Sequence, residues 1–222
     1  MTASELRTRI WRGSELRRTR FHDEKGALAL RRPADLSDCA FALATAILRK
    51  TVGVRLRRPW IALPAWRYVK PRLSRSTAVF EWGCGMSTIW YGRHCGEVHA
   101  VEDDPEWHRV VSLRAGSASV YCAPDEDAYV DKIREFPRAH FDLIVIDGSH
   151  RYGCFQAAPA YLKPGGLLLI DNSDKDRTTQ GDLWLIDRDL DRSESAYEVL
   201  RFTGWAPGNF FPQETTVVTC RR

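Results

Sequence analysis

The sequence predicts an α/β fold: a doubly wound, seven-stranded, mainly parallel sheet with an antiparallel C-terminal hairpin, preceded by a basic, partly helical N-terminal extension. Three observations support this prediction. Five short apolar runs between Ala78 and Ile170 alternate with stretches of helical character. Two later runs rich in strand-forming residues have no helix between them. Residues 1–75 carry 18 Lys and Arg against 6 Asp and Glu, whereas residues 76–222 carry 15 against 23.

This contrast in charge divides the 222 residues into an extension, 1–75, and one acidic domain, 76–222. Within residues 1–32, part of the extension lacks hydrophobic periodicity and is expected to be either disordered or an arm, and another part of the extension is expected to form a helical cap. The apolar content of 44% excludes a disordered chain as a whole. No signal peptide is evident, and the longest apolar run, Cys39 to Leu48, is about half of a bilayer span. The six cysteines form no C-x-x-C pair, so we expect reduced thiols and a cytoplasmic protein.

The first ordered elements are expected inside the extension. A helix is predicted to run to Lys50 from Asp35 or Ser37, either of which can cap it. The Pro-rich segment Pro59–Trp66 predicts a loop, and a short helical turn toward Lys70 follows it.

From Thr77 onward, strands and helices are expected to alternate. The predicted strands are Ala78–Trp82, Glu97–Val101, Ala118–Cys122, Phe141–Ile146 and Leu167–Ile170. The predicted helices are Ser87–Cys95, Pro105–Leu113, Ala128–Glu135, Cys154–Leu162 and Leu183–Leu190. The last two strands, Tyr197–Phe202 and Thr215–Cys220, are expected to pair antiparallel at one edge of the sheet.

Polar side chains follow the predicted strands at the point where each strand ends. They are Glu81, Glu102, Asp125, Asp147 and the pair Asp171 and Asn172. In an open α/β sheet, ligands bind beyond the carboxyl ends of the strands, so we expect these groups to share one site.

The first of these strand ends carries the turn Glu81-Trp-Gly-Cys-Gly-Met-Ser-Thr88. Its two glycines let the backbone approach a ligand, and the helix after them offers free N–H groups. A dinucleotide fingerprint would need a third glycine at Thr88, so that motif is incomplete.

The two acids around this turn distinguish between ligands. Glu81 would repel a pyrophosphate and suits an ammonium group, and Glu102, at the end of the next strand, can accept both hydroxyls of a ribose. S-adenosylmethionine carries both of these groups. The alternative is an ordinary strand–helix turn with a solvated Glu102.

From Thr77 to about Asn172, the chain resembles class I (Rossmann-like) S-adenosylmethionine-dependent methyltransferases. The turn resembles their E-x-G-x-G-x-S-T motif, and Glu102 resembles their ribose-binding acid. Asp125 is expected to accept from the adenine amino group, and Asp127 is nearly as good a candidate. The cofactor-binding residues that the resemblance implies are Glu81, Gly83, Cys84, Gly85, Ser87, Thr88, Glu102, Asp103, Asp125 and Asp147.

A narrower resemblance concerns the chemistry. Catechol-type, metal-dependent O-methyltransferases end strand four with Asp and strand five with Asp-Asn, as this chain does at Asp147, Asp171 and Asn172. The resemblance implies that these three bind Mg²⁺. That family has a Lys general base three residues after the first Asp; here the position holds His150, so His150 and Asp147 are the expected catalytic residues. The alternative is that these side chains cap loops or orient the adenosyl group without a metal.

The sequence therefore predicts O-methylation of a hydroxyl on a small molecule, such as a sugar or a natural-product intermediate. The segment Pro59–Trp66 either shapes the acceptor pocket or simply packs. Alternatives are a nucleic-acid or protein methyltransferase recruited by the basic extension, and a non-catalytic cofactor-binding protein. Nucleic acid is disfavoured because the domain is acidic and no RNA-binding module is present. No transmembrane segment is expected, and the sequence is compatible with a homo-oligomer.

Overall fold

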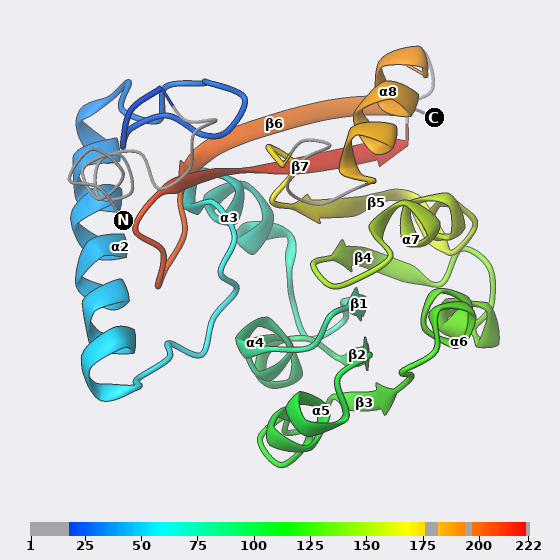
Figure 1. The fold of residues 1–222 in the computed structure, drawn as a ribbon. Coiled ribbons are helices and arrows are strands. Elements are labelled where there is room, and N and C mark those ends of the chain that lie inside the picture. The colour runs from blue at the N-terminus through cyan, green and yellow to red at the C-terminus, as the bar shows by residue number, and fades with distance from the viewer. Residues whose placement is uncertain (1–17, 176–181, 194–196, 221–222) are drawn as a thin grey trace.

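The structure is a computed structural model, and it describes residues 18–175, 182–193 and 197–220 (Figure 1). Within these residues, seven strands form one sheet in the order β3-β2-β1-β4-β5-β7-β6. The strands are β1 (Ala78–Trp82), β2 (Glu97–Glu102), β3 (Ser119–Cys122), β4 (Phe141–Ile146), β5 (Leu162–Asp171), β6 (Tyr197–Trp205) and β7 (Pro212–Cys220). Strands β1 to β5 are parallel, and β7 pairs antiparallel with both β5 and β6. The predicted fold class is confirmed.

The direction in which the sheet is built reverses between β1 and β4. From β1 the chain proceeds outward through β2 to β3, and then returns to place β4 on the other side of β1. The carboxyl ends of β1 and β4 therefore flank the point where ligands bind in folds of this kind.

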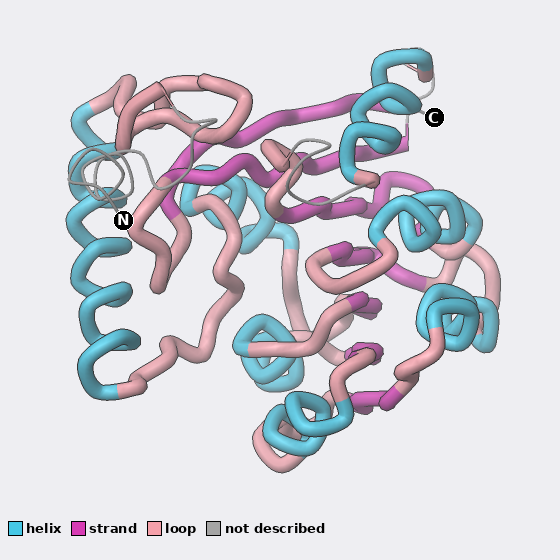
Figure 2. Tube along the Cα trace, viewed as in Figure 1, coloured by secondary structure: helices cyan, strands magenta, loops and turns pink. Residues whose placement is uncertain are grey.

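Helices cover both faces of the sheet (Figures 1 and 2). The described helices are α2 (Pro33–Val52), α3 (Leu63–Val69), α4 (Met86–His94), α5 (Pro105–Ser112), α6 (Glu126–Asp131), α7 (Arg151–Ala157) and α8 (Leu183–Arg192). Alternate residues of one strand point to opposite faces. Phe80 and Trp82 pack with side chains of α6, α7 and α8, whereas Val79 packs with side chains of α3 and α4.

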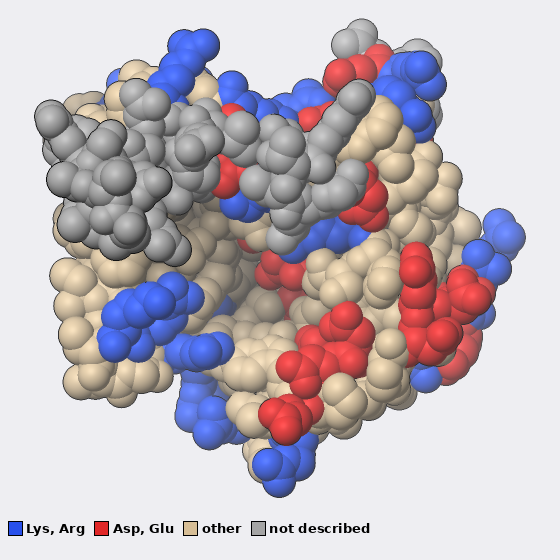
Figure 3. All heavy atoms as spheres, viewed as in Figure 1, with Lys and Arg blue, Asp and Glu red and all other residues tan. Residues whose placement is uncertain are grey.

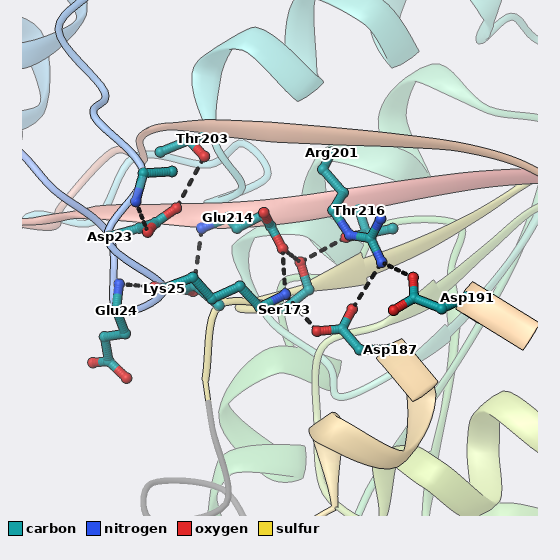
Figure 4. Close-up of polar contacts among 12 residues, drawn as sticks. Asp23, Glu24, Lys25, Ser173, Asp187, Asp191, Arg201, Thr203, Glu214 and Thr216 are labelled. Carbon is teal, nitrogen blue, oxygen red and sulfur yellow. Dashed lines mark hydrogen bonds and ion pairs between the residues drawn. The ribbon is translucent and has the colours of Figure 1, made fainter. Parts of the chain in front are cut away.

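Polar contacts hold the extension against the domain. The Thr45 hydroxyl of α2 accepts a hydrogen bond from the Gly208 N–H of the domain at 2.8 Å. Within the extension, Asp38 of α2 accepts two hydrogen bonds from Arg67 of α3, at 2.9 and 2.8 Å. Before α2, Lys25 lies between Glu214 of β7 and Asp187 of α8 (Figure 4). Among the described helices, none has a stretch long and apolar enough to span a bilayer.

Several element boundaries differ from the predictions. Helix α7 begins at Arg151 rather than Cys154, because His150 adopts a left-handed conformation (φ 49°) that turns the chain directly into the helix. The helix ends at Ala157, and Pro159 follows in a 3₁₀ turn, since proline cannot donate a hydrogen bond to extend the helix. Strand β5 begins at Leu162 rather than Leu167 and reaches its register with β4 through an irregularity opposite Phe141.

Candidate active site

The glycine turn after β1 is shaped by close packing against the loop after β4. Gly83 has φ +91°, and its N–H donates to the Val101 carbonyl at 2.8 Å. A Cβ at this position would lie 2.7 Å from the Cα of Gly148, so no side chain fits. The turn therefore presents bare backbone at the switch point of the sheet.

Glu81 lies behind this turn and is completely buried. The Thr88 hydroxyl donates to its Oε2 at 2.5 Å, while Oε1 has no partner among the described residues. Burial raises the pKa of Glu81 to about 8, against the lowering effect of hydrogen bonds from Ser87 and Thr88. Neither Glu81 nor Thr88 lines the cavity described below. Glu81 is thus a buried carboxyl group with one oxygen left for a donor.

Glu102 ends β2 and is held by the backbone on both sides. Its Oε2 accepts from the Cys84 N–H at 3.0 Å, and its Oε1 accepts from the Asp104 N–H at 3.1 Å. Burial raises its pKa. The carboxylate is only 7% exposed but still lines the cavity, so it is a fixed acceptor for hydroxyl donors.

A cavity of about 320 Å³ opens beyond the ends of β1, β2 and β4. Its lining comes from the glycine turn, from the segments after β2 and β4, and from the loop before α3: Arg55, Trp60, Gly83, Cys84, Gly85, Met86, Ser87, Glu102, Asp103, Trp107, Asp147, Gly148 and Ser149. Figure 3 shows the hollow on this face, with basic side chains on the α2 side and acidic ones opposite.

One end of the cavity is closed by an aromatic ring and a cation. The Trp107 Nε1 donates to the Cys84 carbonyl at 2.8 Å, which fixes the indole beside the glycine turn. The Arg55 guanidinium lies 4.9 Å from the centre of that ring. A flat, uncharged group such as a purine can pack on this surface.

At the ends of β4 and β5, Arg151 lies close to two acids. It lies 3.6 Å from Asp147 Oδ1, donates through Nε to the Gly148 carbonyl at 2.8 Å, and donates through Nη1 to the Asp171 carbonyl. Burial raises the pKa of Asp147 and raises that of Asp171 to about 8; Arg151 opposes both shifts. Asp147 lines the cavity, with its side chain 28% exposed, whereas Asp171 is buried.

The three residues expected to bind Mg²⁺ do not form a suitable donor set. Both carboxylate oxygens of Asp171 accept from Gln213 Nε2, at 3.0 and 2.8 Å, and Oδ1 also accepts from the Thr215 hydroxyl at 2.5 Å. These donors occupy positions that a cation would need. Among the described residues, no group of three or more His, Cys, Asp or Glu side chains is placed to hold a metal ion.

Other expected site residues lie away from the cavity. His150 sits at the start of α7, with its Nδ1 3.3 Å from Glu126 Oε1. Asp125 caps α6 by accepting from the Ala128 N–H at 3.1 Å. Neither side chain lines the cavity. Asn172, with φ +52°, lines a second cavity.

Some residues of the site had no signal in the sequence. Arg55 is one of many arginines in the extension, and nothing local shows that it reaches Trp107. Gln213 and Thr215 are two residues apart in β7, so their side chains point to the same side of the strand. This pair of polar side chains was the one signal in the sequence that they contact the site. Trp60 lies in the segment Pro59–Trp66, which was expected either to shape the acceptor pocket or simply to pack, and it lines the cavity.

Comparisons with known proteins match part of the chain to a family model and match its fold to solved structures. A family model described as a methyltransferase domain matches residues 80–173. The chain is similar to the crystal structure of the O-methyltransferase TomG from Streptomyces achromogenes, involved in tomaymycin synthesis, in complex with SAM; the identity is 15%, the coverage 85% of this chain and 96% of that chain, and the TM-score 0.57.

Two further solved structures show the range of the similarity. An O-methyltransferase from Bacillus cereus in complex with SAH is 17% identical, with coverage of 86% and 93% and a TM-score of 0.57. An rRNA methylase from Streptococcus thermophilus is 10% identical, with coverage of 72% and 95% and a TM-score of 0.53. No curated protein matches the sequence. At these identities the structures establish the fold alone.

Proposed function

We propose that the chain is a class I S-adenosylmethionine-dependent methyltransferase and that it transfers the methyl group to a hydroxyl oxygen of a small molecule. The observation that carries this proposal is Asp147, a carboxylate of raised pKa on the wall of the cofactor cavity. The similarity to structures titled O-methyltransferases supports the same reaction.

The cavity lining suggests how the cofactor lies. Its ribose hydroxyls would donate to the fixed carboxylate of Glu102, and its amino-acid end would lie over the backbone of Gly83 and Gly85. Its adenine would pack near Trp107. In that position the Oε1 of Glu81, behind the turn and without a described partner, would accept a hydrogen bond from the ammonium group. S-adenosylmethionine supplies a methyl group on a sulfonium, which an oxygen nucleophile can displace in line.

Asp147 is the group we assign to the proton of the acceptor hydroxyl. A general base works best when its pKa lies near the working pH, and burial moves Asp147 in that direction. Arg151, beside it, keeps the carboxylate oriented through bonds to the backbone after β4 and β5. His150 stays a second candidate for this role, although its imidazole lies against Glu126.

We propose that the reaction needs no divalent metal. Gln213 and Thr215 already satisfy the carboxylate of Asp171, so the chain supplies neutral donors where a metal-dependent relative would supply a cation.

The basic extension gives little support to recruitment of nucleic acid. Lys25 and Arg67 are matched by acids of the same chain, Lys25 by Asp187 and Glu214, and Arg67 by Asp38. The Lys25 pairs bind the extension to its own domain, and the Arg67 pair lies within the extension. A cytoplasmic location stays a prediction, supported by the five described cysteine side chains, all of them free thiols.

Calorimetry with S-adenosylmethionine tests the placement of the cofactor. Glu102→Gln should weaken binding by about tenfold or more, because charge-assisted bonds to the ribose are lost. Glu106→Gln, at an exposed position on α5, is the matched control and should bind as the wild type does. Equal affinities of wild type and Glu102→Gln would refute the placement.

A further inference from the structure

The structure has a second cavity, of about 450 Å³. Its walls come from the end of α2, the segment after β5, and the turn that leads into β7. Trp60 lines the cofactor cavity, and its carbonyl accepts from Gln213, which lines the second one, at 3.3 Å. Asp147 and Asn172 follow the neighbouring strands β4 and β5. A molecule in the second cavity would therefore lie beside the cofactor.

The lining of this cavity contains cations and no acid. Arg49 and Lys50 come from the last turn of α2, and Lys175 comes from the segment after β5. None of the described residues in the lining is Asp or Glu. Phe210 and Phe211 add two aromatic rings. The cavity thus offers positive charge together with an apolar surface.

Two of these cations lack an acidic partner within the described part of the chain. Lys175 is bound by Glu24 at 2.7 Å. The Arg49 guanidinium lies 5.3 Å from the centre of the Trp60 ring, and no described carboxylate pairs with Arg49 or Lys50. By contrast, Lys25 lies between two acids, as Figure 4 shows. The positive charge of Arg49 and Lys50 therefore remains for a ligand.

We propose that this cavity binds the methyl acceptor and that the acceptor carries an acidic group, a carboxylate or a phosphate, held by Arg49 and Lys50. Phe210 and Phe211 contact its apolar or aromatic body. This inference rests on the proposed function and adds the substrate class to it. Arginine stacked on an aromatic ring keeps N–H donors for an anion, and its planar fork matches carboxylate and phosphate oxygens.

In the reaction, a lone pair of the acceptor hydroxyl oxygen forms the bond to the methyl carbon. The carbon–sulfur bond breaks, and its electron pair stays on sulfur. The hydroxyl proton passes to Asp147 and then to solvent. The products are S-adenosylhomocysteine, the methyl ether and one proton, and the acidic group of the acceptor is unchanged.

Calorimetry on the full chain loaded with S-adenosylhomocysteine tests this proposal. Salicylate and salicyl alcohol are matched probes, because they differ in carboxylate against hydroxymethyl, and phenyl phosphate is the phosphate probe. We expect an acidic probe to bind about tenfold tighter than salicyl alcohol, as a charge-assisted pair allows. The acidic probe that binds tighter shows whether Arg49 and Lys50 prefer a carboxylate or a phosphate.

Variants of the two cations then test whether Arg49 and Lys50 hold the acidic group. Arg49→Met and Lys50→Met should each weaken the acidic probe by about fivefold or more and leave salicyl alcohol unchanged. Arg49→Lys should retain most of the affinity, and Arg93→Met, at an exposed position on α4, is the control for loss of surface charge.

Equal affinity for salicylate, phenyl phosphate and salicyl alcohol, or variants that weaken all three alike, would overturn the acidic acceptor. Failure of S-adenosylhomocysteine to bind would instead overturn the proposed function. The two failures are thus measured in separate titrations.

Discussion

Replacing Glu81 by Gln should stabilise the protein at alkaline pH, although it removes a carboxylate from the centre of the site. Glu81 is completely buried and its Oε1 has no described partner. Its pKa is raised from 4.5 to about 8, mainly by burial. Between these values, the folded state keeps a proton that the unfolded state releases. Stability contributed by the protonated group is therefore present below pH 4.5 and is lost as the pH rises toward 8.

The loss of unfolding free energy follows from the shift in the pKa of Glu81. One group of this kind lowers the free energy of unfolding by at most about 1.4 kcal/mol per pH unit, so the interval from 4.5 to about 8 corresponds to about 5 kcal/mol. This is a large part of the stability of a typical domain, about 5–15 kcal/mol. Asp171, with a pKa of about 8, and Glu102, Asp147 and Asp174, whose pKa values burial also raises, contribute losses of the same sign. Glu97, Asp103 and Asp189 have lowered pKa values, so they do not titrate in this interval.

Urea unfolding followed by tryptophan fluorescence, with a thiol reductant present, measures this directly. In the wild type, the free energy of unfolding should fall steadily from pH 5 to pH 8, the interval given by the shift. In Glu81→Gln the fall should be smaller by up to about 1.4 kcal/mol per unit, and the variant should be the more stable protein at pH 8. Glu106→Gln, exposed on α5, should keep the wild-type slope. An unchanged slope in Glu81→Gln would show that the Glu81 carboxyl is ionised when buried, and the reasoning would fail.

Two further predictions concern the chemistry. Asp147→Asn should lower kcat by about a hundredfold or more with little change in cofactor affinity, and turnover of the wild type should rise with pH as the Asp147 carboxyl, whose pKa is raised, ionises. His150→Ala should keep a turnover near that of the wild type. If instead His150→Ala lost turnover and Asp147→Asn kept it, the proton of the acceptor would be assigned to His150. EDTA followed by added Mg²⁺ should change turnover by no more than about twofold, because Gln213 and Thr215 already satisfy Asp171; a loss on chelation that Mg²⁺ restores would establish a metal enzyme.

The fold was predictable because its signals are local and repeated. Phe141–Ile146 is apolar at nearly every position, as a strand covered on both faces must be, and the other parallel strands are similarly short and bounded. Element boundaries were less predictable, because they depend on contacts with the rest of the fold. The early start of α7 follows from one left-handed residue, His150, which no sequence pattern marks.

The candidate site was predictable where it depends on topology. Gly83, Glu102 and Asp147 end parallel strands, so the order of the sheet alone brings them to one edge. Arg49, Arg55 and Gln213 reach the cavities from segments far away in the sequence, and only the packed structure shows this. The prediction of a magnesium site used only the positions of Asp147 and Asp171 in the sequence. Those positions do not show that β7 places the side-chain amide of Gln213 against the Asp171 carboxylate.

The uneven charge of the chain matches the charges of its two proposed ligands. The acidic domain supplies Glu102 and Asp147 around a cofactor whose sulfonium and ammonium are cationic, whereas the extension supplies Arg49 and Lys50 to an acceptor that we propose to be anionic. The two ligands would then attract each other where the methyl group passes between them. Methyl transfer removes the positive charge of the sulfonium, so this attraction weakens at the moment when both products must leave. The opposite charges of extension and domain thus favour binding of the reactants over binding of the products.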